Sequence, residues 1–89
     1  MDRYAIEFLA SADRALQRLP VIVQRRIVRA VEALAAEPRP PGSMKLAGNE
    51  DTWKIRVGDD RVLYEIHGKR LLVLVIRIGH RKDIDRGGK

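Results

Sequence analysis

The stretch from Thr52 to Ile66 constrains the fold most, because it contains two alternating runs on either side of Gly58-Asp59. Apolar side chains occupy every second position in both runs, which is the pattern of β-strands that bury one face. Two such runs separated by a glycine-containing pair predict an antiparallel hairpin. The residues expected on its buried face are Trp53, Ile55, Val57, Val62, Tyr64 and Ile66.

The opposite face of this hairpin is basic. Lys54 and Arg56 are two residues apart, so their side chains stand next to each other on one strand. Arg61 follows the turn and joins them if the pairing register allows. A concentrated cationic surface on rigid backbone is therefore the main indication of function in this sequence.

Three further segments carry strand signals. A near-continuous apolar run from Leu71 to Ile78 predicts an interior strand that is buried on both faces. Residues 4–8 alternate and predict a first strand, and residues 44–46 predict a short one.

Two segments have apolar residues at helical spacing. The first covers residues 11–19 with Ser11 as its N-cap, and the second covers residues 21–36. Pro20 separates them so closely that they should form an antiparallel helix hairpin. The proline-rich connector 37–42 cannot continue the second helix.

These elements predict a single α+β domain over residues 1–89. Their order is strand, helix, helix, short strand, hairpin, strand. Helices that are segregated from the strands favour packing on one face of an antiparallel sheet. We expect an N-terminal strand and a two-helix antiparallel hairpin packed on a twisted antiparallel sheet of about four strands.

The composition excludes several classes of function. The chain has no cysteine and two histidines, so we expect no metal site and no cofactor. Its longest apolar run is far too short to cross a bilayer, and no signal-peptide pattern is present, so we expect a cytoplasmic protein without membrane contact. The net charge of +6, carried mostly by arginine, indicates binding to nucleic acid or to an acidic protein.

A set of basic side chains forms the candidate site. Such side chains can hold a scissile phosphate and stabilise the charge that builds on its oxygens. With a base for the RNA's own 2′-hydroxyl and an acid for the leaving 5′ oxygen, the cluster would cut RNA without a metal. A cationic docking surface for an acidic protein is the alternative. The candidate catalytic residues are Lys54, Arg56, Arg61, His80 and Arg81, and the candidate RNA-binding residues are Lys45, Lys54, Arg56, Arg61, Arg77 and Lys82.

Several short motifs follow one another along nearly the whole chain. They are Leu16-Gln-Arg-Leu-Pro20, Pro38-Arg-Pro-Pro-Gly42 with Lys45-Leu46, Trp53-Lys-Ile-Arg-Val-Gly-Asp59 with Arg61-Val-Leu-Tyr64, and Gly79-His-Arg81. In their order and spacing they resemble the RelE/ParE superfamily, the toxins of bacterial and archaeal type II toxin–antitoxin pairs. The fold of that superfamily agrees with the order of elements predicted above.

The resemblance implies a toxin that a cognate acidic antitoxin neutralises. RelE-like members enter the ribosomal A site and cut mRNA there without a metal. By position, Lys54 and Arg61 match residues that stabilise the phosphate, and Arg81 matches a proposed acid. Arg56 stands where the well-known members have a lysine that acts as base, and His80 stands where some relatives use a histidine.

The chain also departs from the family pattern. A guanidinium hardly ever loses its proton, so Arg56 suits phosphate binding and His80 is the better proton carrier. Asp60 and Asp85 stand where the family often has tyrosine. One alternative is therefore a ParE-like toxin that inhibits DNA gyrase through protein contacts. Another is a weakened toxin that acts with its antitoxin on operator DNA.

Overall fold

The computed structural model describes residues 3–48 and 51–87, and for residues 85–87 the backbone alone. Helices and strands occur in the predicted order, and a short helix follows at the C-terminal end. The elements are β1 (Ala5–Phe8), α1 (Ala10–Gln17), α2 (Val21–Ala33), β2 (Met44–Lys45), β3 (Thr52–Val57), β4 (Asp60–His67), the 3-10 helix η1 (Gly68–Arg70), β5 (Leu72–His80) and α3 (Arg81–Gly87).

Within the described residues, five strands form one sheet in the order β1-β5-β4-β3-β2. The predicted α+β class is confirmed, with one strand more than the number expected. As predicted, the apolar run that forms β5 is an interior strand. The sheet is mixed, because β1 pairs with β5 in parallel while the other pairs are antiparallel. Alternation shows which face a strand buries, but not the direction of its neighbour.

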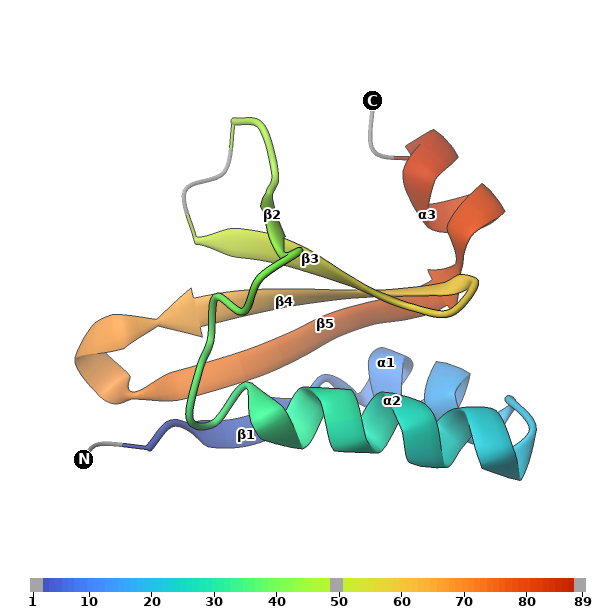
Figure 1. Ribbon diagram of the computed structural model, residues 1–89, viewed down its shortest axis with the longest axis horizontal. Coiled ribbons are helices and arrows are strands. Elements are labelled where there is room, and N and C mark those ends of the chain that lie inside the picture. The colour runs from blue at the N-terminus through green and yellow to red at the C-terminus, as the bar shows by residue number, and fades with distance from the viewer. Residues whose placement is uncertain (1–2, 49–50, 88–89) are drawn as a thin grey trace.

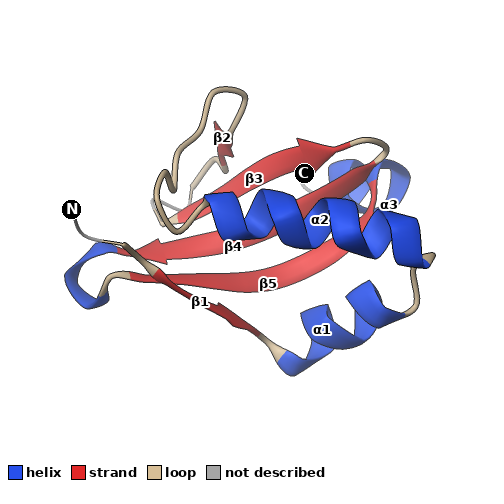
Figure 2. Cartoon of the chain, turned by 60° about the horizontal axis from the view of Figure 1, so that its bottom comes forward, coloured by secondary structure: helices blue, strands red, loops and turns tan. Residues whose placement is uncertain are grey.

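The helices divide between the two sides of the sheet. Figure 1 shows α1 and α2 on one side, with α3 on the other, and Figure 2 shows α2 lying over the strands. The core lies between the strands and α2, where Ile27, Val31 and Val62 are at most 1% exposed. The predicted buried face of the hairpin is confirmed: Trp53 is half-buried, and the buried members are Ile55, Val57, Val62, Tyr64 and Ile66.

A tight turn joins β3 to β4, as predicted. Val57 pairs with Asp60, so Gly58 and Asp59 alone make the connection. Gly58 has a φ of +61°, the left-handed conformation that a type II′ turn needs at this position. This turn fixes the register of the whole hairpin and therefore the positions of its basic residues.

The first helix begins before its predicted cap. The backbone N–H of Leu9 donates to the Val75 carbonyl at 2.9 Å, so the chain stays in the sheet through Leu9. The Leu9 carbonyl accepts the N–H of Asp13, and α1 therefore begins at Ala10 without a side-chain cap. The prediction of Ser11 as the N-cap was wrong, because the sheet hydrogen bond sets where the helix starts.

A buried tyrosine holds the connector between α2 and β2. The second helix ends at Ala33, three residues before its predicted end, and its C-cap is in the αR conformation. The Tyr64 hydroxyl then donates to the Pro38 carbonyl at 2.7 Å. Nearby, the guanidinium of Arg39 lies 5.3 Å from the centre of the Trp53 ring. The proline-rich connector is thus fixed against the hairpin.

Candidate functional site

The strand register gathers four basic side chains on the sheet face that lies away from α1 and α2. Arg56 in β3 pairs directly with Arg61 in β4. Lys54 and Arg77 both pair with Leu63, from opposite sides of β4. Directly paired residues share a face, as do residues two apart, so these side chains belong to one surface. We call Lys54, Arg56, Arg61 and Arg77 the basic surface.

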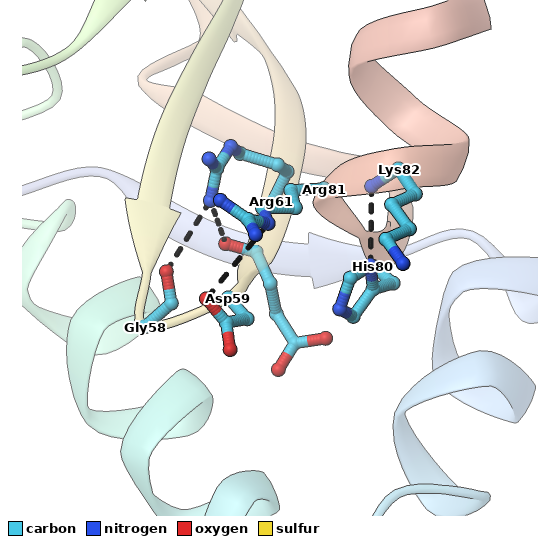
Figure 3. A network of polar contacts seen from close by, with 7 residues as sticks. Gly58, Asp59, Arg61, His80, Arg81 and Lys82 are labelled. Carbon is cyan, nitrogen blue, oxygen red and sulfur yellow. Dashed lines mark hydrogen bonds and ion pairs between the residues drawn. The ribbon is translucent and has the colours of Figure 1, made fainter.

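Arg61 lies at the centre of this surface and is 7% exposed. One of its terminal nitrogens, Nη1, donates to the Asp60 carbonyl at 3.0 Å and to the Gly58 carbonyl at 3.3 Å (Figure 3). Those contacts hold the guanidinium beside the turn, and burial lowers the local dielectric constant, which strengthens its field. Arg56, directly opposite, is exposed and available to an incoming anion.

The same turn also holds Arg81, the first residue of α3. Its backbone N–H donates to the Asp59 carbonyl at 2.8 Å. Its side-chain Nε lies 4.0 Å from Asp59 Oδ1, with the two side chains 55% and 76% exposed. So exposed an ion pair contributes little to stability. The backbone hydrogen bond therefore fixes the position of the Arg81 backbone, while its guanidinium can still turn toward a ligand.

His80 does not lie with the basic surface. It pairs with Asp60, whereas its neighbour Gly79 pairs with Arg61. Successive residues of a strand point to opposite faces, so His80 belongs to the face opposite Arg61. Its Nδ1 accepts the backbone N–H of Lys82 at 3.1 Å and so caps the start of α3 (Figure 3).

A glycine allows α3 to pack against the sheet beside the basic surface. A Cβ added at Gly79 would lie 3.2 Å from Ile84 Cδ1 and 3.3 Å from Ile84 Cγ1. Ile84 is 3% exposed, so it is the contact through which α3 docks. Sequence analysis missed this role and that of Asp59, although a glycine inside a strand pattern often marks a close approach.

The other predicted RNA-binding residues lie apart. Lys45 pairs with Trp53 on the edge of the sheet and therefore shares the face of that ring. Lys82 is exposed on α3. The side chain of Asp85, where the family often has tyrosine, lies outside the described residues.

Across residues 3–48 and 51–87, no group of three or more histidine, cysteine or acidic side chains is placed to hold a metal ion. Over the same part of the chain, none of the helices has the length and apolar character needed to cross a membrane.

Comparison with known proteins gives consistent matches. A family model described as the ParE toxin of the parDE type II toxin–antitoxin system matches residues 3–85. Toxin RelG of Mycobacterium tuberculosis is 34% identical over 87 residues, which cover 93% of this chain and 97% of the relative. A putative RelE-like toxin protein of Escherichia coli is 28% identical over 85 residues, covering 93% and 88%.

Two solved complexes contain a similar fold. The archaeal RelE–RelB complex from Pyrococcus horikoshii gives a TM-score of 0.80 at 28% identity, covering 89% of this chain and 96% of that chain. The toxin–antitoxin complex RelBE2 from Mycobacterium tuberculosis also gives 0.80, at 29% identity, covering 91% and 94%.

Proposed function

The chain belongs to the RelE/ParE superfamily as the toxin of a type II toxin–antitoxin system, and from this premise we propose that it is a metal-independent endonuclease that cuts mRNA in the ribosomal A site. The observation that carries the proposal is the basic surface. Its register-paired Arg56 and Arg61 place two guanidinium groups on the sheet face that lies away from α1 and α2, with Arg81 at the same turn.

Four basic residues have parts in the proposed reaction. The RNA's own 2′-hydroxyl gives its proton to solvent water and attacks the adjacent phosphorus. A new P–O2′ bond forms, the P–O5′ bond breaks, and the leaving 5′ oxygen takes up a proton from solvent. Arg56 and Lys54 contact the non-bridging oxygens, and Arg61 supplies a fixed positive field behind them. Arg81 reaches the leaving 5′ oxygen from the start of α3. Catalysis then rests mainly on charge stabilisation and on the alignment of the mRNA that the ribosome imposes.

Primer extension on a reporter mRNA with programmed ribosomes tests this proposal. We expect cuts at A-site codons that require both the protein and the ribosome. The double variant Arg61→Ala/Arg81→Ala should lower cleavage about 100-fold or more, since losing one electrostatic donor costs roughly that much. Arg70→Ala, an exposed arginine of η1, serves as the matched control. Cleavage by the double variant at the control's rate would refute the catalytic roles.

A second candidate is a ParE-like inhibitor of DNA gyrase. The placement of His80 favours it, because that ring caps α3 and faces away from Arg61. A guanidinium hardly ever gives up its proton, so Arg56 is a poor base. A supercoiling assay with purified gyrase distinguishes the two candidates. Inhibition of gyrase supercoiling without ribosome-dependent cuts would favour the gyrase inhibitor over the nuclease.

The toxin should act under the control of a cognate antitoxin. Of the two solved complexes named above, one is a RelE–RelB complex and the other is the toxin–antitoxin complex RelBE2. For this chain we propose an acidic antitoxin, because the +6 net charge favours a partner of opposite sign. The same complex would bind operator DNA.

A further inference from the structure

A hollow of about 390 Å³ opens at the outer edge of β3, between the end of α2 and the connector that leads to β2. Figure 2 shows this connector leaving the end of α2 and running to β2. The walls are aliphatic except for one arginine, and none of the lining residues is acidic. They are Ala30, Ala33, Pro40, Pro41, Gly42, Ile55 and Arg56. We call this space the edge hollow.

The edge hollow exists because the pairing of β2 with β3 covers only part of β3. The first residue of β2 is Met44, which pairs with Lys54. Extended by two residues, the same antiparallel register would place Gly42 opposite Arg56. Gly42 has a φ of +91° instead, and the N–H of the residue after it donates to the Pro40 carbonyl at 3.0 Å. The connector therefore turns away from the sheet and leaves a space where the next pair of residues would meet.

The open edge presents the backbone of one residue. Along a strand, the backbone N–H and C=O groups of successive residues point to opposite edges. The Thr52 carbonyl accepts the N–H of Leu46 at 2.9 Å, so Thr52 faces β2. Arg56 lies four residues further on and faces the same edge, where no strand covers it within the described residues. Because β3 ends at Val57, Arg56 alone in this strand directs a donor and an acceptor toward the edge hollow.

The width of this opening decides what it can bind. A peptide that adds a strand needs a ladder of several residues, and this edge offers only one. A nucleobase needs less, because its Watson–Crick edge carries a donor beside an acceptor. Its flat faces would lie against the methyl groups of Ala30 and Ala33 and the rings of Pro40 and Pro41. Such contact stabilises a bound base in proportion to the apolar area removed from water.

Arg56 also joins the edge hollow to the basic surface. It lines the hollow, while its exposed side chain lies opposite Arg61 on the face proposed to hold the scissile phosphate. One nucleotide can therefore engage both. Arg81 is proposed at the leaving 5′ oxygen, and its helix α3 packs against β5 and β4, whereas the hollow lies at the far edge of β3. The nucleotide in the hollow is accordingly the one on the 5′ side of the cut.

We propose that the edge hollow binds the base of the nucleotide whose 2′-hydroxyl attacks. The proposal rests on the proposed nuclease function and adds a specificity site to it. The small side chains of Ala30 and Ala33 leave room for either ring size, and a purine gains more apolar contact than a pyrimidine. A larger residue in this wall should therefore exclude purines first.

NMR spectroscopy tests base binding without catalysis. The probe is the dinucleotide ApA with 2′-deoxyribose, which lacks the attacking hydroxyl and stays intact. At about 5 mM, a concentration that detects weak sites, we expect nuclear Overhauser effects from adenine protons to the methyl groups of Ala30 and Ala33. An analogue with an abasic 5′ sugar keeps the phosphate and should bind at least about fivefold more weakly.

A matched pair of variants tests the wall. Ala33→Leu enlarges an exposed wall residue, the last of α2, with a good helix former. It should weaken ApA binding at least about fivefold, because overfilling a space is costly. Ala10→Leu makes the same change at an exposed residue of α1, outside the hollow, and should change binding less than about twofold. Circular dichroism checks that both variants fold.

The programmed-ribosome assay reads the same wall during cleavage. Ala33→Leu should lower cleavage at least about fivefold more where a purine precedes the cut than where a pyrimidine does. Ala10→Leu should leave that ratio unchanged.

Four results would overturn the proposal: no contacts from ApA to the two wall methyl groups, equal affinity for the abasic analogue, equal losses in both variants, or a purine-to-pyrimidine ratio that Ala33→Leu leaves unchanged. Contacts to a short peptide of alternating threonine and valine, but not to ApA, would assign the hollow to strand addition. Wild-type cuts together with any of these results would retain the nuclease without this base site. Base contacts without ribosome-dependent cuts would refute the nuclease and retain the hollow as a nucleotide-binding site.

Discussion

Tyr64→Phe removes one hydroxyl and little else from the fold. The ring has no exposed surface, and its hydroxyl donates to the carbonyl of Pro38, itself buried. The phenylalanine variant keeps the packing of the ring but leaves that carbonyl without its donor. A buried acceptor left this way costs roughly 1–2 kcal/mol of unfolding free energy at neutral pH.

The same hydroxyl makes stability depend on pH. Burial raises the pKa of Tyr64 from 10.0 to about 12, against smaller opposing effects of Ser43 and Arg39. Folding therefore disfavours the phenolate. The stabilisation is fully present below pH 10 and is lost as pH rises through about 12. The wild type should lose about 1.4 kcal/mol from this group by pH 11 and approach about 3 kcal/mol at higher pH.

Urea unfolding of both proteins at pH 7 and pH 11 measures this effect. The advantage of the wild type over Tyr64→Phe should fall from roughly 1–2 kcal/mol to near zero. Tyr4→Phe, at a half-buried tyrosine of the first strand region, controls for loss of a hydroxyl elsewhere. A stability advantage of the wild type that is unchanged at pH 11 would refute the reasoning. It would mean that the Tyr64 phenolate is as well solvated in the folded protein as in the unfolded chain.

Three further substitutions concern the site. Arg56→Thr should raise the free energy of unfolding, measured in urea, by up to about 0.5 kcal/mol, because like charges directly opposite in a sheet repel. Primer extension should show that the same variant cleaves at least about tenfold less. Cleavage at the wild-type rate would contradict this prediction. Gly79→Val should push against Ile84 and loosen α3, so amide hydrogen exchange should rise in residues 81–84 and stay unchanged in β4. His80→Ala should cost about 1 kcal/mol as a lost cap and leave the pH profile of cleavage unchanged; a shifted profile would place the imidazole in the chemistry.

The hairpin could be predicted because its alternation and its turn are both local. Val62 and Tyr64 are buried where the pattern placed them, and Gly58 adopts the positive φ that the two-residue turn requires. The start of α1 could not be predicted, because the bond from Leu9 to Val75 joins residues far apart in the sequence. A cap at Ser11 was the locally favourable choice, and a sheet hydrogen bond outweighed it.

Arg77 was among the candidate RNA-binding residues, but the sequence did not show which face of the sheet it occupies. The run that forms β5 is apolar at almost every position, so it shows no alternation. Val73 and Val75 are buried two residues apart, but the next buried residue is Ile78, three further on. The register shift between Leu63 and Tyr64 accounts for the change. Without that bulge, Arg77 would share the face of Val75 and would lie outside the basic surface.

His80 illustrates the reverse case, in which closeness in the sequence misleads. It stands between Gly79 and Arg81, and the resemblance assigned it to the site with its neighbours. In a strand, however, adjacent side chains point to opposite faces, and the pairing of Gly79 with Arg61 places His80 on the other side. The residues that do share a face are a lysine and arginines, which bind phosphate well and release protons poorly. The structure therefore supports phosphate binding at this surface more strongly than proton transfer. We therefore propose that this surface binds the phosphate by charge and that the ribosome supplies the alignment for the cut.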